Sequence, residues 1–259
     1  MAAPGYEDID VSVHDEIAVL TLRRPEVRNA LRYQTFAELE AAVLSTSARV
    51  LIVTGEDPAF CSGDDVRAIM GSGEQRARVP RTPRLTPAAD AFLYTDTPVI
   101  AAVNGAAVGW GMELALLADF RIVSERARFG ELFVRRGLVS DPVGLGRLAQ
   151  LVGREKATEL LMTGDVIDAD EARRIGLVGR VVPHEELLNE AGALARRIAA
   201  NPPLAVRAIK QGLRRALDPD WASLGRWVSE TLDRLFDTED HREGVRAFLE
   251  KREPKFVGA

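Results

Sequence analysis

The sequence is poor in the residues that build disulfides and metal centres. Its 259 residues include one cysteine, Cys61, and three histidines, His14, His184 and His241. A single cysteine forms no disulfide within the chain, and the histidines lack the spacing of metal ligands. Because no histidine is close to it in sequence, Cys61 is expected to pack as a small apolar side chain rather than to act as a nucleophile. We therefore expect no metal site and a reducing compartment.

Long hydrophobic runs and an excess of positive charge are also missing. No apolar stretch approaches the length of a membrane span, and residues 1–8 lack the basic and apolar regions of a secretory signal. The net charge of −5 gives no general attraction to nucleic acid or to anionic membranes. These absences predict a cytoplasmic protein with no nucleic-acid or membrane partner. With 46% hydrophobic residues, the chain can still bury a large core.

The most informative stretch, residues 98–120, reads PVIAAVNGAAVGWGMELALLADF. Val99–Val103 is a short run rich in β-branched residues, which is typical of a strand buried on both faces. Glycines then flank Trp110 before a segment of good helix formers, Met112–Ala118. The N–H groups and the dipole of a helix start suit a phosphate, a carboxylate or an oxyanion formed during a reaction. Glu113, in the first turn, either takes part in that chemistry or only complements the dipole.

A second segment has a similar design. Val50–Val53 is another β-like run, and the glycine-bounded loop TGEDPAFCSGDD, residues 54–65, leads from it into the helical Val66–Met70. The two strand ends can therefore converge. Three further motifs are residues 22–31 (LRRPEVRNAL), 161–165 (LMTGD) and 176–178 (GLV). Together with the two segments above, they have the order and spacing found in one known family. Across nearly the whole chain, the sequence resembles the enoyl-CoA hydratase/isomerase, or crotonase, family.

Strand patterns are concentrated in the first half of the chain and helix patterns in the second. Alternating residues predict a β-hairpin from Ile9–Val13 and Ile17–Leu22, followed by a helix over Tyr33–Ser45. Residues 71–87 are basic and proline-rich, and we expect them to form a mobile loop. From residue 145 to residue 251, apolar residues recur at helical spacing.

This gradient agrees with the fold that the resemblance implies. That fold is α/β, the crotonase (ClpP/crotonase-like) spiral of repeated ββα units with a C-terminal helical region. We expect a core with the active site over residues 1–200 and a helical trimerisation region over residues 201–259. Family members are typically trimers or pairs of trimers, so the resemblance implies a homotrimer or a dimer of trimers.

The resemblance also implies an acyl-CoA thioester as substrate. Removing an α-hydrogen, or adding a nucleophile at the β-carbon, places negative charge on the thioester oxygen as an enolate. Two backbone N–H groups stabilise such an oxygen, and by resemblance they belong to Asp64 and Trp110. Both residues depart from the small residue common at these positions, and Asp64 could instead cap a helix. Glu113 matches the family's catalytic carboxylate.

The second catalytic acid is less clear. Phe133 occupies the position of the hydratases' second glutamate, and a phenyl ring cannot transfer a proton. Asp141 resembles the acid of several isomerase-type members, although an Asp before a Pro is also an ordinary helix N-cap. Glu131 is a third carboxylate nearby, which does not match the motif and is a further candidate only. We predict Glu113 and Asp141 as the catalytic residues of a double-bond isomerase. Hydration of 2-enoyl-CoA is the alternative, and a non-catalytic acyl-CoA-binding protein is a second one.

Four residues are predicted by resemblance to contact coenzyme A: Arg28, Ser62, Phe248 and Lys251. Without the family, composition favours Arg28 as a solvated surface charge and the last helix as an amphipathic tail with a solvated lysine. Coenzyme A would enter as part of the substrate. We expect no prosthetic group.

Overall fold

The computed structural model describes residues 5–69, 85–218 and 220–257. The strands of the larger sheet are, in spatial order, β1 (Ile9–His14), β2 (Ile17–Leu22), β3 (Val50–Gly55), β5 (Val99–Val103), β7 (Phe120–Ser124) and β10 (Arg180–Val182). Those of the smaller sheet are β4 (Ala59–Cys61), β6 (Ala106–Val108), β8 (Arg128–Gly130) and β9 (Ile167–Asp168).

Helices occupy most of the remaining chain. The α-helices are α1 (Tyr33–Ser45), α2 (Val66–Ile69), α4 (Pro87–Tyr94), α5 (Trp110–Leu117), α6 (Pro142–Val152), α7 (Arg154–Thr163), α8 (Ala169–Arg174), α9 (Leu187–Ala199), α10 (Pro203–Leu217), α11 (Trp221–Phe236) and α12 (Glu239–Glu250). Short 3₁₀ helices are η1 (Pro25–Val27), η2 (Phe133–Arg136) and η3 (His184–Glu186).

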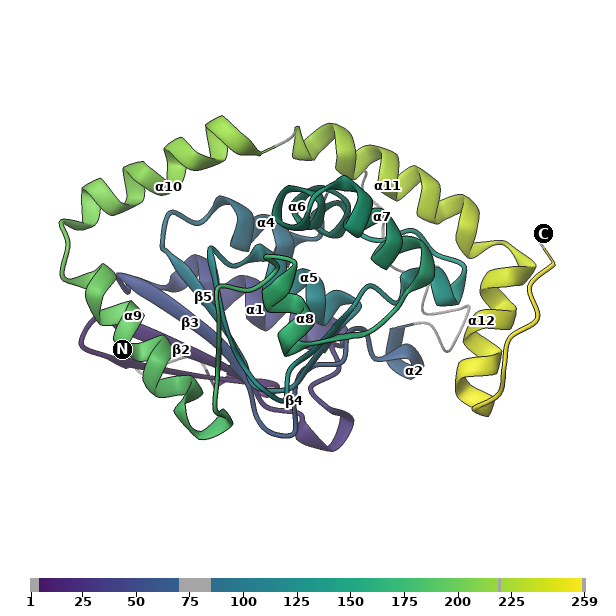
Figure 1. Ribbon diagram of the computed structural model, residues 1–259, viewed down its shortest axis with the longest axis horizontal. Coiled ribbons are helices and arrows are strands. Elements are labelled where there is room, and N and C mark those ends of the chain that lie inside the picture. The colour runs from purple at the N-terminus through teal and green to yellow at the C-terminus, as the bar shows by residue number, and fades with distance from the viewer. Residues whose placement is uncertain (1–4, 70–84, 219, 258–259) are drawn as a thin grey trace.

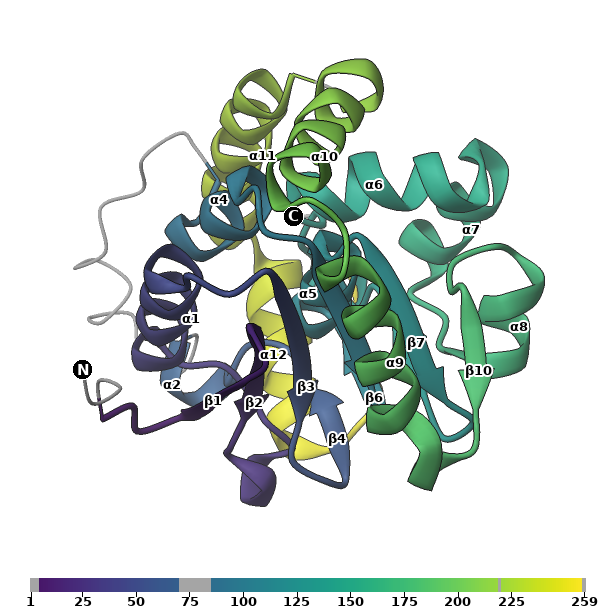
Figure 2. The same ribbon diagram turned by 90° about the vertical axis from the view of Figure 1, so that its left-hand side faces the viewer.

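The larger sheet is covered on both faces. After the antiparallel β1–β2 hairpin, β2, β3, β5, β7 and β10 are all parallel. Every residue of β3 and β5 is buried, as expected for continuous apolar strands. Residues of α9 pack with Ile52 and Ile100 on one face, whereas Leu51 and Val53 join the main core with α1 and α5 on the other. Figure 2 shows β3 between α1 and α9.

A repeated strand–strand–helix unit builds the spiral. In two successive units, β3–β4–α2 and β5–β6–α5, the first strand joins the larger sheet and the second joins the smaller one. Strands β7 and β8 repeat the same division before the chain reaches η2 and α6. Parallel pairing of β4 with β6, and of β6 with β8, stacks the units so that corresponding turns lie side by side. The expected ββα spiral is therefore present.

The last three helices form an arc over the core. In Figure 1, α10 and α11 run along the top of the molecule and α12 descends at one side. Four large apolar side chains of α10 are exposed: Leu204, Ile209, Leu213 and Leu217. A single chain does not test the trimer or the division at residue 200, and both stay predictions.

The chain returns to its core through α12. Gly244 lies so close to η2 that a Cβ there would meet the Cα of Arg136 at 2.9 Å. The His241 ring nitrogen Nδ1 lies 2.8 Å from the Arg136 carbonyl oxygen. The final helix thus supports the short 3₁₀ turn that follows β8.

Most local predictions agree with these elements. The hairpin, α1, α10 and α11 have the expected positions, whereas β4 falls within the segment that was predicted as a loop. Of the predicted mobile loop, residues 71–84 lie outside the described residues, and Pro87 begins α4 with Thr86 as its N-cap. None of the helices in the described ranges has the length and apolar character needed to cross a bilayer.

Candidate active site

The loops after β4 and β6 meet backbone to backbone. These strands pair with Cys61 opposite Ala107. A Cβ on Gly63 would lie 2.8 Å from the Val108 carbonyl oxygen and 3.2 Å from the Trp110 nitrogen. Such close approach, together with a φ of +84° at Gly63, permits only glycine. The amides of Asp64 and Trp110 are thereby brought to the same place.

Both of these amides lack a partner in regular structure. Asp64 forms a parallel bridge with Leu31, in which Leu31 N–H donates to Gly63 and Asp65 N–H donates to Leu31, each at 2.8 Å. In this pattern, the N–H of Asp64 itself is directed away from Leu31. Trp110 is the first residue of α5, and its N–H therefore has no acceptor within the helix. Neither N–H group is thus used by the regular backbone pairing around it, and their role as an oxyanion hole stays a prediction.

The side chain of Asp64 does not cap a helix. Asp65 has that role, because its Oδ1 accepts the N–H of Ala68 at 3.2 Å in α2. Burial raises the pKa of Asp64 to about 7, and the Asp141 charge also raises it, while the Arg136 cation lowers it. At neutral pH, Asp64 is therefore partly protonated, which limits the negative charge beside its own amide.

Glu113 is held at the start of α6. Its side chain is 1% exposed, and its Oε2 accepts the N–H of Gly144 at 2.7 Å. Its Oε1 has no hydrogen-bond partner within the described part of the chain. Burial raises the pKa of Glu113, the charges of Glu131 and Asp141 raise it further, and backbone N–H groups at the helix start oppose them. A buried carboxylate with a raised pKa suits the role of a general base.

Asp141 takes the N-cap position of α6 without capping the helix. Its side chain forms no capping hydrogen bond. Instead, burial raises the pKa of Asp141 to about 6, and a hydrogen bond from the Trp110 side chain opposes that rise. The Trp110 ring is 3% exposed and packs edge-on against Phe36 of α1, with centroids 4.7 Å apart. The Trp110 indole thus lies near the second predicted acid and lowers its pKa.

Glu131, which matches no family motif, lies near Glu113 and Asp141. It directly follows β8, is fully buried, and both of its carboxyl oxygens lack a hydrogen-bond partner within the described residues. Burial raises its pKa to about 8, and the Asp141 charge adds to this; nearby Ser140 lowers it. Phe133, two residues on, is buried in η2. The sequence signal for Glu131 was only its place at a strand end.

The remaining titratable candidates are structural. Cys61 is fully buried, and burial raises the pKa of its thiol to about 12, as expected for a packing residue. His184 lies 3.1 Å from the Ser124 hydroxyl and 3.0 Å from an Asp57 oxygen. Within the described ranges, no cluster of three or more His, Cys, Asp or Glu side chains could hold a metal ion.

Two of the predicted coenzyme A contacts are neighbours. Ser62 N–H donates to the Arg28 carbonyl at 3.1 Å, and the Ser62 hydroxyl donates to the Val27 carbonyl at 3.2 Å. The Arg28 side chain is exposed. Their contact with coenzyme A stays a prediction.

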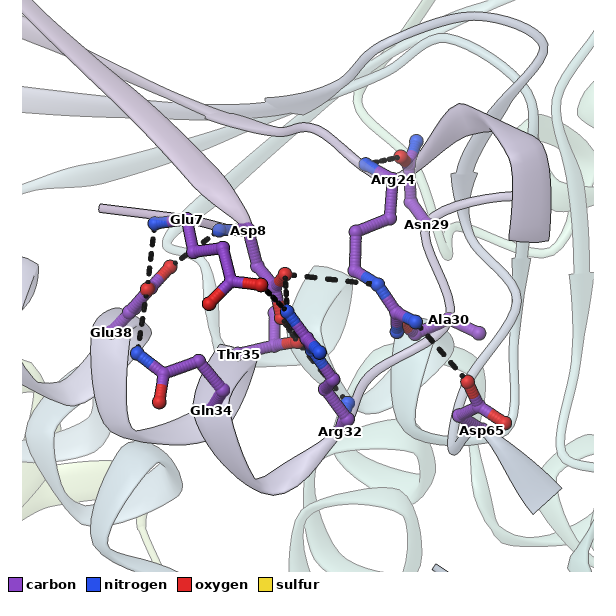
Figure 3. Close-up of polar contacts among 10 residues, drawn as sticks. All are labelled: Glu7, Asp8, Arg24, Asn29, Ala30, Arg32, Gln34, Thr35, Glu38 and Asp65. Atoms are coloured by element: carbon purple, nitrogen blue, oxygen red, sulfur yellow. Dashed lines mark hydrogen bonds and ion pairs between the residues drawn. The ribbon is translucent and has the colours of Figure 1, made fainter. Parts of the chain in front are cut away.

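A polar network fixes the loop that carries Arg28 (Figure 3). The Arg24 guanidinium donates to the Ala30 carbonyl at 2.6 Å and lies 3.3 Å from Asp65 and 3.7 Å from Asp8. Asn29 donates to the Ala59 carbonyl at 2.7 Å, which ties the loop to β4. This network connects the loop to both sheets.

The other two predicted contacts lie on the last helix. The exposed Phe248 ring stacks under the Arg136 guanidinium, 4.7 Å from it, and Lys251 ends α12 in a left-handed conformation with a φ of +54°. No hydrogen bond or ion pair among the described residues joins Lys251 to Arg28 or Ser62. Arg136 was not predicted, because its neighbours come from a distant helix.

Comparisons with known proteins agree with this arrangement. The model of the enoyl-CoA hydratase/isomerase family matches residues 12–259. The chain belongs to this family. It is 38% identical to the crotonyl-CoA hydratase of Syntrophomonas wolfei, over 98% of this chain and 99% of that one. It is 36% identical to the 2,3-dehydroadipyl-CoA hydratase of Escherichia coli, over 97% and 99%.

Solved structures of the family share the fold. An enoyl-CoA hydratase/isomerase from Pseudoalteromonas atlantica has a TM-score of 0.87 at 28% identity, covering 97% of this chain and 100% of that one. A carnitinyl-CoA hydratase from Mycobacterium avium has a TM-score of 0.85 at 31% identity, covering 97% and 99%. The protein is therefore an enzyme of the crotonase fold. Because these relatives are named as hydratases, they support the hydratase alternative better than the isomerase preference.

Proposed function

We propose that this enzyme hydrates 2-enoyl-CoA thioesters. The observation that carries the proposal is the close packing of Gly63, which precedes Asp64, against Val108 and Trp110, with the buried carboxylate of Glu113 in the first turn of the helix that Trp110 begins. This set suits a reaction that builds negative charge on a thioester oxygen while a proton moves nearby. The hydratase names of full-length relatives add support.

The proposed mechanism divides the work between the amides and the carboxylates. The thioester oxygen binds to the N–H groups of Asp64 and Trp110, which stabilise the enolate as it forms. Glu113 and Asp141 hold one water, and Glu113 accepts a proton as the water oxygen bonds to the β-carbon. The pair then returns a proton to the α-carbon, so that one water is added across the double bond.

Crotonyl-CoA tests the proposal directly. We expect its conjugated thioester absorbance to disappear on incubation with the purified protein and a 3-hydroxyacyl-CoA to form, one water heavier by mass spectrometry. Glu113→Gln is the matched control and should give little product. If crotonyl-CoA stays unchanged in the presence of folded protein, hydration is contradicted.

A second candidate is migration of a double bond from the 3- to the 2-position. Phe133 favours it, because isomerisation needs one base and a route for the proton to the γ-carbon rather than a carboxylate pair around water. A 3-enoyl-CoA in the same assay separates the two reactions. Conversion of that thioester without hydration of crotonyl-CoA would favour isomerisation.

Asp141→Asn is expected to lower turnover about 100-fold or more, because a neutral amide cannot exchange a proton. The melting temperature should change little, since the Asp141 side chain does not cap α6. Steady-state kinetics and thermal unfolding measure the two effects. Asp168→Ala is the control: this side chain does cap α8, accepting the Glu171 N–H at 2.9 Å, so its removal should lower stability and spare turnover. Full activity in Asp141→Asn would remove Asp141 from the mechanism.

A further inference from the structure

Two buried carboxyl groups meet at one glycine. A Cβ on Gly144 would lie 2.5 Å from Oε1 of Glu113 and 3.0 Å from Oε1 of Glu131. Glu113 comes from the first turn of α5, Glu131 from the end of β8, and Gly144 from the first turn of α6. The two Oε1 atoms thus face the same small space, which only a glycine leaves open.

The two carboxyl groups differ in the donors around them. Glu113 receives the Gly144 N–H and lies at the positive end of the α6 dipole, which favours its ionised form. Glu131 receives no hydrogen bond that meets normal geometry within the described residues, and no basic side chain is among the groups that shift the pKa of Glu113 or Glu131. An ionised carboxylate is strongly disfavoured when it is buried without hydrogen-bond donors. The neutral form therefore suits Glu131, and the charged form suits Glu113.

We propose that Glu131 is a positioning residue that retains a proton beside Glu113, so that the buried pair carries one negative charge, located on Glu113. The O–H of Glu131 then donates to the Oε1 of Glu113, which otherwise has no partner. Two carboxyl groups that share a site hold a single proton for the same electrostatic reason. This inference rests on the proposed function, in which Glu113 is the base.

The groups around the pair shift the pKa of Glu131 in both directions, and those that raise it prevail. Asp141, at the start of α6, raises the pKa of Glu131, and the Ser140 hydroxyl alone lowers it; burial sets the pKa near 8. Arg136, on η2, acts on Asp64. Above the pKa of Glu131, a second negative charge would face Glu113 and the forming enolate. Catalysis should therefore decrease as the pH rises through that pKa.

The pH dependence of kcat/KM for crotonyl-CoA tests this role. In the natural enzyme, we expect kcat/KM to decrease about tenfold per pH unit above the pKa of Glu131. In Glu131→Gln, this alkaline decrease should be absent, because a glutamine side chain does not lose a proton at high pH. Glu125→Gln, the same change at an exposed residue, is the matched control and should keep it. An alkaline decrease that persists in Glu131→Gln would overturn the proposal.

Infrared spectroscopy tests the proton itself without any turnover. At pH 7, the difference spectrum between the natural enzyme and Glu131→Gln should show the C=O band of one protonated carboxyl, because the contribution of the partly protonated Asp64 is common to both proteins and cancels. If Glu131→Gln does not fold, Glu113→Gln replaces it: without its charged neighbour, the band of Glu131 should titrate at lower pH than in the natural enzyme. A difference spectrum without this band would overturn the proposal. With the expected bands but no turnover of crotonyl-CoA, the retained proton stands and the hydratase function fails.

Discussion

Replacing Glu113 with glutamine is expected to lower turnover by about 10²- to 10⁴-fold while acyl-CoA affinity changes little. The loss follows from removing a general base. Glutamine has nearly the same shape, and its amide oxygen can still accept the Gly144 N–H that now binds Oε2 at 2.7 Å. Ground-state contacts are therefore kept, and the effect belongs to the transition state.

Single-turnover kinetics and calorimetric titration with a non-reactive acyl-CoA separate these quantities. Glu125→Gln is the control, because this side chain is exposed on the turn after β7 and should leave both quantities unchanged. If Glu113→Gln bound the thioester tenfold more weakly but turned it over at the natural rate, Glu113 would be a binding residue rather than a base.

Substituting alanine for Gly63 is expected to lower kcat about 10²- to 10³-fold, the effect of losing one oxyanion donor. The methyl group would meet the Val108 carbonyl at 2.8 Å and the Trp110 nitrogen at 3.2 Å, so the two loops must separate. A φ of +84° adds backbone strain of about 1 kcal/mol or more. We therefore expect both kcat and the free energy of unfolding to decrease.

Kinetics and denaturant unfolding measure the two losses on the same preparation. Gly212→Ala in α10 is the matched control, because no atom lies within 4 Å of a Cβ there and alanine is the better helix former. That variant should keep kcat and gain slight stability. A Gly63→Ala protein with natural kcat would show that the amides of Asp64 and Trp110 need not be so close.

Local sequence patterns predicted the long elements and the short strands at residues 121–123 and 128–129, but they missed β4 and β6. The run Val99–Val103 and the helix Pro203–Leu217 carry enough residues for their periods to show, and both occur as expected. By contrast, β4 and β6 contain three residues each, and Ala59–Cys61 looked like part of a loop. Such short strands form because they pair with each other across the spiral, a contact that local composition does not record.

Local sequence likewise identified only some residues of the candidate site. Glu113 was found from its spacing after the glycine turn, which is local information. For Asp141, the local Asp-Pro pattern allowed a helix cap, whereas the structure shows no capping hydrogen bond from its side chain, and its catalytic role stays a prediction. Glu131 had no motif, and only the packed structure shows that it is fully buried beside Glu113. Arg136 over Phe248 is likewise a contact between distant segments.

The narrow space at Gly144 also constrains how the family can diversify. A side chain at this position would collide with Oε1 of Glu113 at 2.5 Å and with Oε1 of Glu131 at 3.0 Å. Any larger residue at 144 therefore requires a shorter residue at 113 or 131, or a different path for the start of α6. Among relatives, these three positions should covary, and a chain that exchanges the glycine should have lost one of the two acids in the same lineage.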